Sequence, residues 1–306
     1  MASLDQFQGC LLGLSLGDAL GARYEGGILE RLLWRVIGKT SQGEMRWTDD
    51  TQMTIDLIES YLARREFDAT DLAARFARNY RWDRGYGPGT AKVLKRIARG
   101  VDWQQANRSV YPGGSFGNGA AMRAPILGLI KANRMELIAD VARQTAIVTH
   151  AHPIAIEGAV LVATTTALAA QGRGPIETLK MAADCCSNDV FTSRLAIAQS
   201  WLVSGQIVTV SEIAQHLGRG VAADKSCVTA VYLASNYLNK PFLEMLQLIT
   251  KLGGDADTIG AMAGAIWGAA NGATNLPAES LSKLEQCERL ADLGRQLYQR
   301  LIATDS

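Results

Sequence analysis

Apolar residues recur three and four positions apart along almost the whole chain, and this spacing restricts the fold more than any other feature. It is clear at residues 53–62 and again at residues 281–301. A helix places such residues on one face, whereas a half-buried strand needs strict alternation, which is nearly absent here. We therefore expect an all-α fold of about a dozen or more helices joined by short loops. Ile207–Val210 is the only strand-like segment.

Three segments, residues 9–21, 117–128 and 260–272, are rich in glycine and alanine. Glycine inside a helix costs roughly 1 kcal/mol relative to alanine, so its repeated use indicates helices packed too closely for side chains. We expect these segments to form central helices. No repeat or long linker divides the chain, and its length fits one compact domain spanning residues 1–306.

The charge is balanced, with 31 Lys and Arg against 30 Asp and Glu. Because this leaves no basic field, we expect neither a stable nucleic-acid complex nor a membrane partner. The longest apolar stretch, Pro153–Ala170, carries Glu157 and three threonines, which argues against a membrane span. Five cysteines without a Cys-x-x-Cys pair, and Asp5 where a signal peptide would be basic, predict a reduced, cytoplasmic location.

Four acidic residues form two short clusters far apart in the chain. The first is Thr48-Asp49-Asp50-Thr51, directly before an apolar helical pattern. Thr48 is a suitable N-cap, and first-turn carboxylates are stabilised by the helix dipole by roughly 0.3 to 1 kcal/mol each. A well-capped helix alone would explain this cluster.

The second cluster, Asp255-Ala256-Asp257-Thr258, follows two glycines and precedes the most apolar helical pattern of the chain. A helix that is apolar all round is buried, and its first turn is buried with it. Buried carboxylates need a partner, and of the basic residues only Arg46 and Lys251 lie within four positions of either cluster. Oxygen ligands of this kind suit Mg²⁺ or Mn²⁺ better than Zn²⁺, and two clusters are enough for a pair of ions.

Two further motifs complete a pattern: Gly17-Asp18-Ala19-Leu20-Gly21 and Gly117-Asn118-Gly119-Ala120-Ala121-Met122-Arg123. Together with the acidic clusters, and in this order, they resemble the ADP-ribosylglycohydrolases, which include the dinitrogenase reductase-activating glycohydrolases. The resemblance runs from Gly9 to Gly272. It implies a compact orthogonal bundle of helices with a dinuclear Mg²⁺ or Mn²⁺ centre in a cleft, whose ligands would be Thr48, Asp49, Asp50, Asp255, Asp257 and Thr258.

The activity that the resemblance implies is hydrolysis of the bond between ADP-ribose and an acceptor. The family that the chain resembles has an acidic residue beside its metals, and Glu25 is the matching residue here. The candidate general acid or base is Glu25, Asp257 or Asp50. The acceptor stays open among arginine, serine, a nucleic-acid base and a small ADP-ribose derivative. The expected partner is ADP-ribose or an ADP-ribosylated substrate, and the protein is expected to be a monomer. The alternative is a non-catalytic member that binds nucleotides or serves as a crystallin-like structural protein.

The stretch Tyr111–Gly119 holds four glycines within seven residues. It predicts a nest of backbone N–H groups that meets a diphosphate at a helix starting near Ala120, although a close-packed turn would use glycine equally well. In similar proteins this loop contacts the diphosphate and the distal ribose. The resemblance therefore assigns substrate contacts to Ser115, Phe116, Gly117, Asn118 and Gly119, with the ring of Phe116 against a base or ribose.

His150 and His152 are two positions apart and would point to different faces of a helix, with no nearby Cys or Glu to complete a zinc site. A histidine that satisfies a helix end is the simple interpretation. By resemblance, His150 borders the substrate cleft and is a candidate contact to ribose or phosphate.

Gly13–Gly17 and Gly113–Gly117 both fit Gly-x-Ser-x-Gly, the nucleophile elbow of α/β-hydrolases. That elbow requires a preceding strand. The first match lies inside a helical pattern and the second follows no buried strand, so a serine hydrolase is not favoured.

Overall fold

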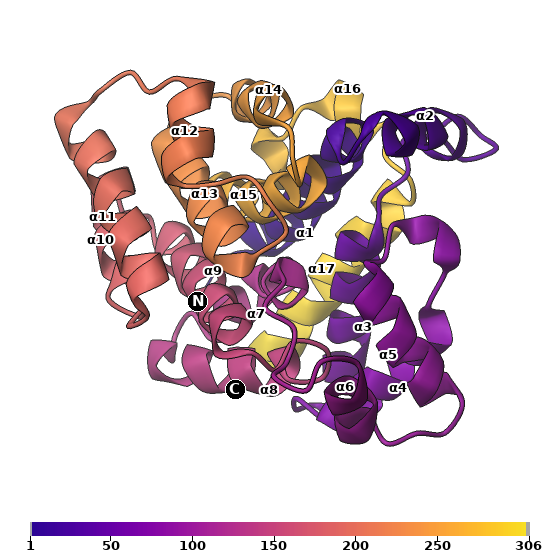
Figure 1. Cartoon of the computed structure of the whole chain (residues 1–306). Coiled ribbons are helices and arrows are strands. Elements are labelled where there is room, and N and C mark those ends of the chain that lie inside the picture. The colour runs from indigo at the N-terminus through magenta and orange to yellow at the C-terminus, as the bar shows by residue number, and fades with distance from the viewer. Residues whose placement is uncertain (1, 304–306) are drawn as a thin grey trace.

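The computed structural model describes residues 2–303, and nearly every segment of that range is helical (Figure 1). Seventeen α-helices and five short 3-10 turns occur between residues 2 and 303, with isolated bridges but no β-strand. The all-α prediction is confirmed. Ile207–Val210 is not a strand, because Thr209 caps a helix that begins at Val210.

The first half of the chain forms α1 (Leu4–Gly21), α2 (Ile28–Ile37), α3 (Asp49–Arg64), α4 (Ala69–Asn79), α5 (Pro88–Ala98), α6 (Trp103–Val110), α7 (Pro125–Ile130) and α8 (Ile138–Ala146). The second half forms α9 (Pro153–Ala170), α10 (Pro175–Ala183), α11 (Asp189–Ser204), α12 (Val210–His216), α13 (Ala223–Tyr237), α14 (Phe242–Leu252), α15 (Ala256–Asn271), α16 (Ala278–Leu281) and α17 (Cys287–Ile302). Many of these helices are capped at the N-terminus by an Asp, Asn, Ser or Thr side chain that accepts a hydrogen bond from a backbone N–H of the first turn, as Asp68 does for α4.

Helices α1 and α15 run antiparallel at the centre of the molecule and touch backbone to backbone (Figure 1). A Cβ at Gly13 would overlap the carbonyl oxygen of Gly264, and one at Gly17 would overlap that of Gly260. A Cβ at Gly264 or Gly260 would likewise overlap the carbonyl oxygen of its partner in α1. The spacing of four residues keeps these glycines on one face of each helix. The prediction of closely packed glycine-rich helices is confirmed for residues 9–21 and 260–272.

Helix α9 forms another part of the centre. It is the one helix among the described residues that is long and apolar enough to cross a membrane by composition, and 72% of it is buried inside the fold. It packs against α7, α8, α10, α13 and α15. Thr165 and Thr166 donate to carbonyl oxygens one turn earlier, so their buried hydroxyls are satisfied.

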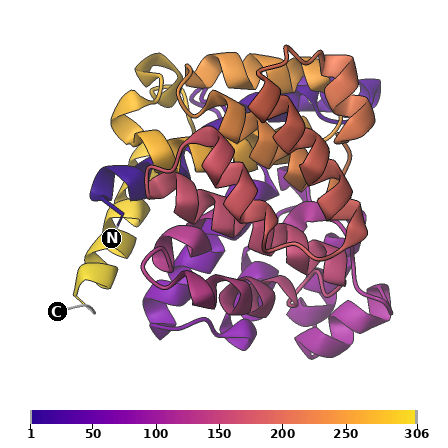
Figure 2. The ribbon, with the colours of Figure 1, turned by 90° about the vertical axis from the view of Figure 1, so that its left-hand side faces the viewer.

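The last long helix returns to the first. Gly294 of α17 lies against the backbone of Gln8 in α1, and Figure 2 shows the start of α1 and the end of α17 on the same side of the molecule. The buried apolar side chains of α1, α3, α9, α13 and α15 belong to one continuous cluster. The helices that carry the acidic motifs are therefore anchored in a common core.

One helix starts later than expected. The glycine loop leads into a 3-10 turn, Asn118–Ala120, and not into a helix near Ala120. Helix α7 begins only at Pro125, which suits the first turn of a helix because it has no N–H group to leave unpaired. A helix dipole therefore does not point from Ala120 at the glycine loop.

Replacing Gly264 by alanine should destabilise the protein by about 3 kcal/mol or more, because the added methyl group would overlap backbone that cannot move aside. Denaturant-induced unfolding followed by circular dichroism measures the loss. Gly220→Ala is the matched control: nothing lies within 4 Å of its added methyl group. Equal stability of the two variants would contradict the tight contact between α1 and α15.

Candidate active site

Helix α3 begins with a side-chain cap, as its sequence predicts. The Thr48 hydroxyl accepts a hydrogen bond from the N–H of Asp50, at 3.3 Å. The fully buried Asp18 of α1 holds this turn from outside, accepting from the N–H of Thr48 at 2.9 Å and from the Thr51 hydroxyl at 2.6 Å. Asp18 thus positions the first acidic cluster, a role that its sequence motif alone did not reveal.

Helix α15 begins from a turn made by two glycines in the left-handed region. Gly253 has φ of +64° and Gly254 has φ of +74°, conformations that other residues rarely adopt. The N–H of Asp255 donates to the carbonyl oxygen of Arg219 at 3.0 Å, and the N–H of Gly26 donates to that of Gly254 at 3.4 Å. The second bond ties the Glu25 segment to the start of α15.

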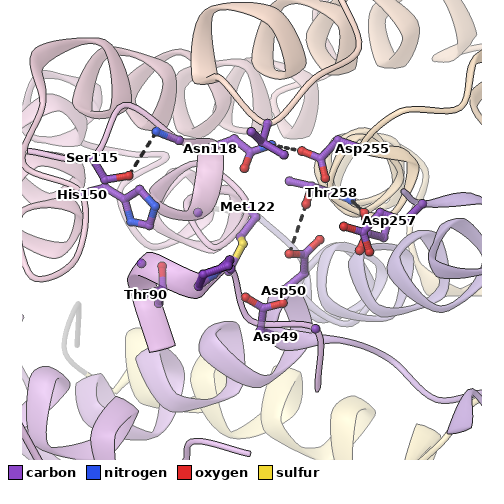
Figure 3. A pocket seen from close by; sticks show the side chains of 18 of the residues that line it. Asp49, Asp50, Thr90, Ser115, Asn118, Met122, His150, Asp255, Asp257 and Thr258 are labelled. Carbon is purple, nitrogen blue, oxygen red and sulfur yellow. Dashed lines mark hydrogen bonds between the residues drawn. The ribbon is translucent and has the colours of Figure 1, made fainter. Parts of the chain in front are cut away.

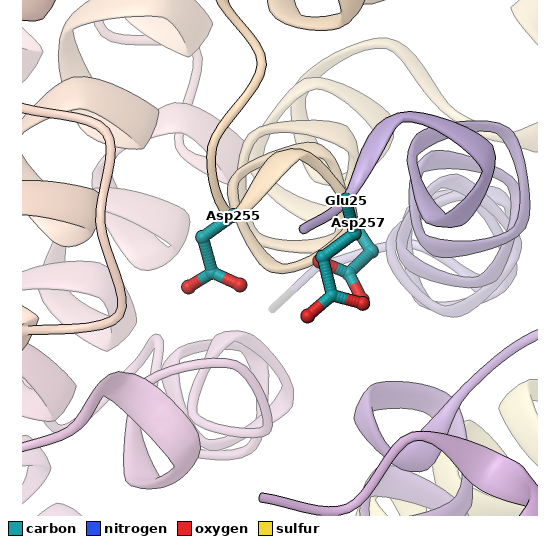
Figure 4. A group of neighbouring side chains, drawn as sticks. All are labelled: Glu25, Asp255 and Asp257. Atoms are coloured by element: carbon teal, nitrogen blue, oxygen red, sulfur yellow. The ribbon is translucent and has the colours of Figure 1, made fainter. Parts of the chain in front are cut away.

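Carboxylates from three parts of the chain converge at these helix starts (Figures 3 and 4). One oxygen atom from each of Glu25, Asp255 and Asp257 lies within 4.8 Å of the other two. The Thr258 hydroxyl lies 3.4 Å from Oδ1 of Asp50, a residue 208 positions away in the chain. The two acidic clusters therefore meet, as the sequence led us to expect.

This concentration of negative charge makes ionisation unfavourable. Burial raises the pKa of Asp50 well above its ordinary value, and the charges of Asp18 and Asp49 raise it further. Burial and the neighbouring Glu25 do the same to the pKa of Asp257. Without a cation, several of these carboxyls hold their protons at pH values where exposed ones have lost them.

The donor set fits a hard divalent cation. Oδ2 of Asp50 is buried and has no hydrogen-bond partner within the described part of the chain, and no lysine or arginine lines the cavity in front of it. An unpaired buried charge costs several kcal/mol. Carboxylate and hydroxyl oxygens are the ligands that Mg²⁺ and Mn²⁺ accept, so the residues present suit the metal centre that the resemblance implies.

A cavity of about 240 Å³ opens in front of these carboxylates (Figure 3). Most of the predicted site residues line it, namely Glu25, Asp49, Asp50, Ser115, Gly117, Asn118, Gly119, His150, Asp255, Asp257 and Thr258. Two predicted residues do not. Thr48 is buried behind the cavity, and Phe116 points elsewhere, 55% exposed, with its ring edge-on to that of His152.

The glycines of the Tyr111–Gly119 loop serve more than one purpose. A Cβ at Gly114 would overlap the backbone of His152, and one at Gly119 would overlap the His150 ring. For these two, the close-packed turn is the explanation. Gly117 and Gly119 also line the cavity.

Asn118 connects this loop to the acidic site. Its side-chain amide donates to the Ser226 hydroxyl at 2.9 Å and to a carboxylate oxygen of Asp255. The second bond lowers the pKa of Asp255, although burial raises it more, so that the net pKa lies above the ordinary value. A cavity-lining loop and a candidate metal ligand therefore share one hydrogen bond.

The two histidines lie in different environments. His152 caps α9 by accepting a hydrogen bond from the N–H of Ile154 at 3.2 Å, so the helix-end interpretation is right for this residue. His150 is buried against the cavity, and burial together with the charge of Arg123 lowers its pKa to about 3. It is therefore neutral at neutral pH.

Several cavity residues were not predicted as site residues: Gly85, Gly87, Pro88, Gly89, Thr90, Tyr111, Met122 and Val221. The first five belong to the segment that joins the 3-10 turn Trp82–Arg84 to the first turn of α5. Arg84 anchors it by pairing with Glu285 at 2.7 Å and stacking on Trp47, both far away in sequence. Its glycines were the only local signal.

Comparison with known proteins identifies the relatives of this chain. The family model described as ADP-ribosylglycohydrolase matches residues 1–306. The chain belongs to the ADP-ribosylglycohydrolase family. The human ADP-ribosylhydrolase ARH3 is 32% identical over 350 residues, with 97% of this chain and 95% of that protein covered.

Other members of the ADP-ribosylglycohydrolase family agree. The ADP-ribosylarginine hydrolase Tri1 of Pseudomonas putida is 26% identical, covering 99% of this chain and 80% of that protein. A solved structure described as an ADP-ribosylglycohydrolase-related protein complex has a TM-score of 0.73 at 28% identity and covers 97% of this chain and 98% of its own. The sequence-based family assignment is confirmed, and the protein is a glycohydrolase enzyme.

The raised pKa values predict a pH-dependent effect of metal removal. The folded protein retains protons on its clustered carboxyls that the unfolded chain releases above about pH 4, so without metal its unfolding free energy should decrease as pH rises. Saturating Mg²⁺ offsets the repulsion, and more strongly at higher pH. Melting temperatures with EDTA and with Mg²⁺, between pH 5 and 8, should diverge as pH increases. A constant difference would contradict the prediction.

Replacing Asp50 by asparagine should separate stability from metal binding. It removes one of the repelling charges and should raise the melting temperature in EDTA by about 2 °C or more, while abolishing stabilisation by Mn²⁺. Thermal unfolding with and without Mn²⁺ measures both effects. Asp56→Asn is the control. Asp56 is a buried carboxyl outside the site that accepts a hydrogen bond from Asn79, so its replacement should leave the response to Mn²⁺ intact.

Proposed function

We propose that the protein is a Mg²⁺- or Mn²⁺-dependent hydrolase that cleaves the glycosidic bond between ADP-ribose and an acceptor. The observation that carries this proposal is the meeting of Glu25, Asp255 and Asp257 within 4.8 Å, next to Asp50, at the end of a cavity. Family membership supplies the class of bond that is cleaved.

The ions would be held by oxygen atoms from the two helix starts, namely Thr48, Asp49, Asp50, Asp255, Asp257 and Thr258. The unpartnered Oδ2 of Asp50 and the repulsion among these carboxyls support this assignment. When bound, a divalent cation neutralises the carboxylates and orients ribose hydroxyls and water.

The chain itself would bind and orient the sugar and move a proton. Cleavage at the anomeric carbon of ribose passes through an oxocarbenium-like state, helped by a carboxylate that activates water or protonates the leaving group. Glu25 is our candidate for this proton transfer, because it belongs to a loop and not to either helix start. Asp257 and Asp50 are the alternatives, each better placed to hold metal.

The far end of the cavity would receive the diphosphate and the distal ribose. Ser115, Gly117, Gly119 and His150 line the cavity on the side of the glycine loop, with Asn118 between them and Asp255, and they offer neutral hydrogen-bond donors. Phe116 does not face the cavity, so a contact of its ring with a base or ribose would require this loop to rearrange. We also propose that the protein acts as a single-domain monomer.

The acceptor is a finer question. Tri1, named for ADP-ribosylarginine, is less similar in sequence than ARH3, although the two match 99% and 97% of this chain. We propose that the acceptor is chosen by a group of cavity-lining residues that carry no carboxylate, namely Gly85, Gly87, Pro88, Gly89, Thr90 and Tyr111.

Purified protein with Mg²⁺ or Mn²⁺ should release ADP-ribose from at least one ADP-ribosylated peptide, and Asp257→Asn should reduce kcat/KM by about a thousandfold or more. Chromatographic quantification of free ADP-ribose measures the release. Parallel assays on ADP-ribosyl-arginine and ADP-ribosyl-serine peptides identify the acceptor. Full activity of Asp257→Asn, or in EDTA, would refute metal-dependent hydrolysis.

Glu25→Gln should lower kcat by about a hundredfold while Mn²⁺ affinity, measured by calorimetry, changes only a few-fold. Such a split would mark Glu25 as the proton-transfer group. Loss of Mn²⁺ binding would instead make it a metal ligand.

A further inference from the structure

Behind the cavity lies a buried arginine that no catalytic role accounts for. The side chain of Arg123 is completely inaccessible to solvent. Its guanidinium donates to the carbonyl oxygen of Gly119 and to that of Thr145, the latter at 3.0 Å, and it lies over the ring of Phe76. A third bond goes to the Thr149 hydroxyl, also at 3.0 Å.

These contacts determine where the protons of the next residue lie. A guanidinium can only donate, so Oγ1 of Thr149 accepts from Arg123. The Thr149 hydroxyl then has its own proton to donate, and Nδ1 of His150 lies 2.8 Å away. Within the described part of the chain, Thr149 Oγ1 has no other hydrogen-bond partner. If Nδ1 donated instead, the buried hydroxyl proton of Thr149 would have no acceptor, so the contacts favour Nδ1 as the acceptor and place the proton of the neutral imidazole on Nε2.

Nε2 is the ring nitrogen nearest to the two cavity-lining glycines. A Cβ built at Gly117 would lie 3.5 Å from Nε2 of His150, and Gly119 lies against the same edge of the ring. Both glycines line the cavity, as do His150 and Ser115, which Figure 3 shows close together. The ring therefore presents an N–H group, and not a lone pair, to whatever occupies this end.

We propose that Arg123 and Thr149 are positioning residues that hold His150 in its Nε2–H form, a fixed neutral donor for an acceptor oxygen of the ligand. A phosphate oxygen has no proton to give, so the opposite tautomer would place two lone pairs face to face. The identity of the ligand as ADP-ribose rests on the proposed function. The tautomer itself does not.

The burial of the ring also keeps the donor neutral. Burial and the charge of Arg123 lower the pKa of His150 to about 3. The surroundings of His150, with Arg123 among them, thus determine both its charge state and its tautomer. Gly119 completes it, since any side chain there would overlap the imidazole.

Nitrogen-15 NMR of the ligand-free protein tests the tautomer directly, because protonated and unprotonated ring nitrogens have well-separated shifts. The chain has only three histidines, so His150 can be assigned by the signals lost in His150→Gln. We expect the Nε2–H form at pH 7. An Nδ1–H form in the wild-type protein would overturn the proposal without any variant.

Thr149→Val removes the hydroxyl and keeps the shape of the side chain. We expect a mixture of tautomers and an approximately tenfold higher Kd for ADP-ribose, measured by calorimetry with saturating Mg²⁺. Thr149→Ser should restore both values. Thr166→Val is the matched control: Thr166 is equally buried, bonds only its own helix and should change neither.

The outcomes separate this inference from the proposed function. A pure Nε2–H form in Thr149→Val would remove the positioning role of Thr149, whatever the affinity. If no acceptor is hydrolysed in any assay, the proposed function fails while the tautomer result stands. A Thr149→Ser protein that keeps its tautomer but binds ADP-ribose as weakly as Thr149→Val would show that tautomer does not control binding.

Discussion

The direct backbone contact between α1 and α15 is the constraint on which the site depends. Glycines spaced by four let the two helices approach until their backbones touch. At one end of the contact, Gly21 lies against the first turn of α15, so the segment that follows α1 delivers Glu25 beside Asp255 and Asp257. Side chains between the helices would separate these carboxylates. The spacing of the acidic site is therefore set by backbone and not by rotamers.

Helix α1 also positions the other half of the site. Asp18 projects from it to bind the first turn of α3, and thereby places Asp49 and Asp50. Contacts with α1 therefore hold both acidic clusters in place. The resulting repulsion among carboxyls is a stability cost tolerated at a functional site, because a cation removes it.

Much of this arrangement is visible in the sequence, for physical reasons. Helical periodicity and glycine spacing are local and regular, so the all-α class and the central helices could be predicted. The meeting of the acidic clusters could also be inferred, because buried carboxylates demand a partner. The start of α7 was misplaced, because the three-residue turn at Asn118–Ala120 satisfies the backbone without an α-helix.

What sequence could not supply depends on contacts between distant residues. The stretch around Arg84 becomes a cavity wall only through Glu285 and Trp47, neither of which is marked by a local pattern. The outward direction of Phe116 and the role of Asp18 are also tertiary. Similarly, His150 could be named as a candidate, but its orientation required Thr149 and Arg123 to be seen around it.

The order of the partners along the chain has a consequence for synthesis. Helix α1 leaves the ribosome long before α15 does, and α17, which packs on another part of α1, follows α15. Until then the glycine face of α1 has no surface to meet, and such distant contacts form slowly. The site can therefore form only once α15 has been made, and a chain that stops before Ala256 can have neither the central helix pair nor the complete set of carboxylates for a cation.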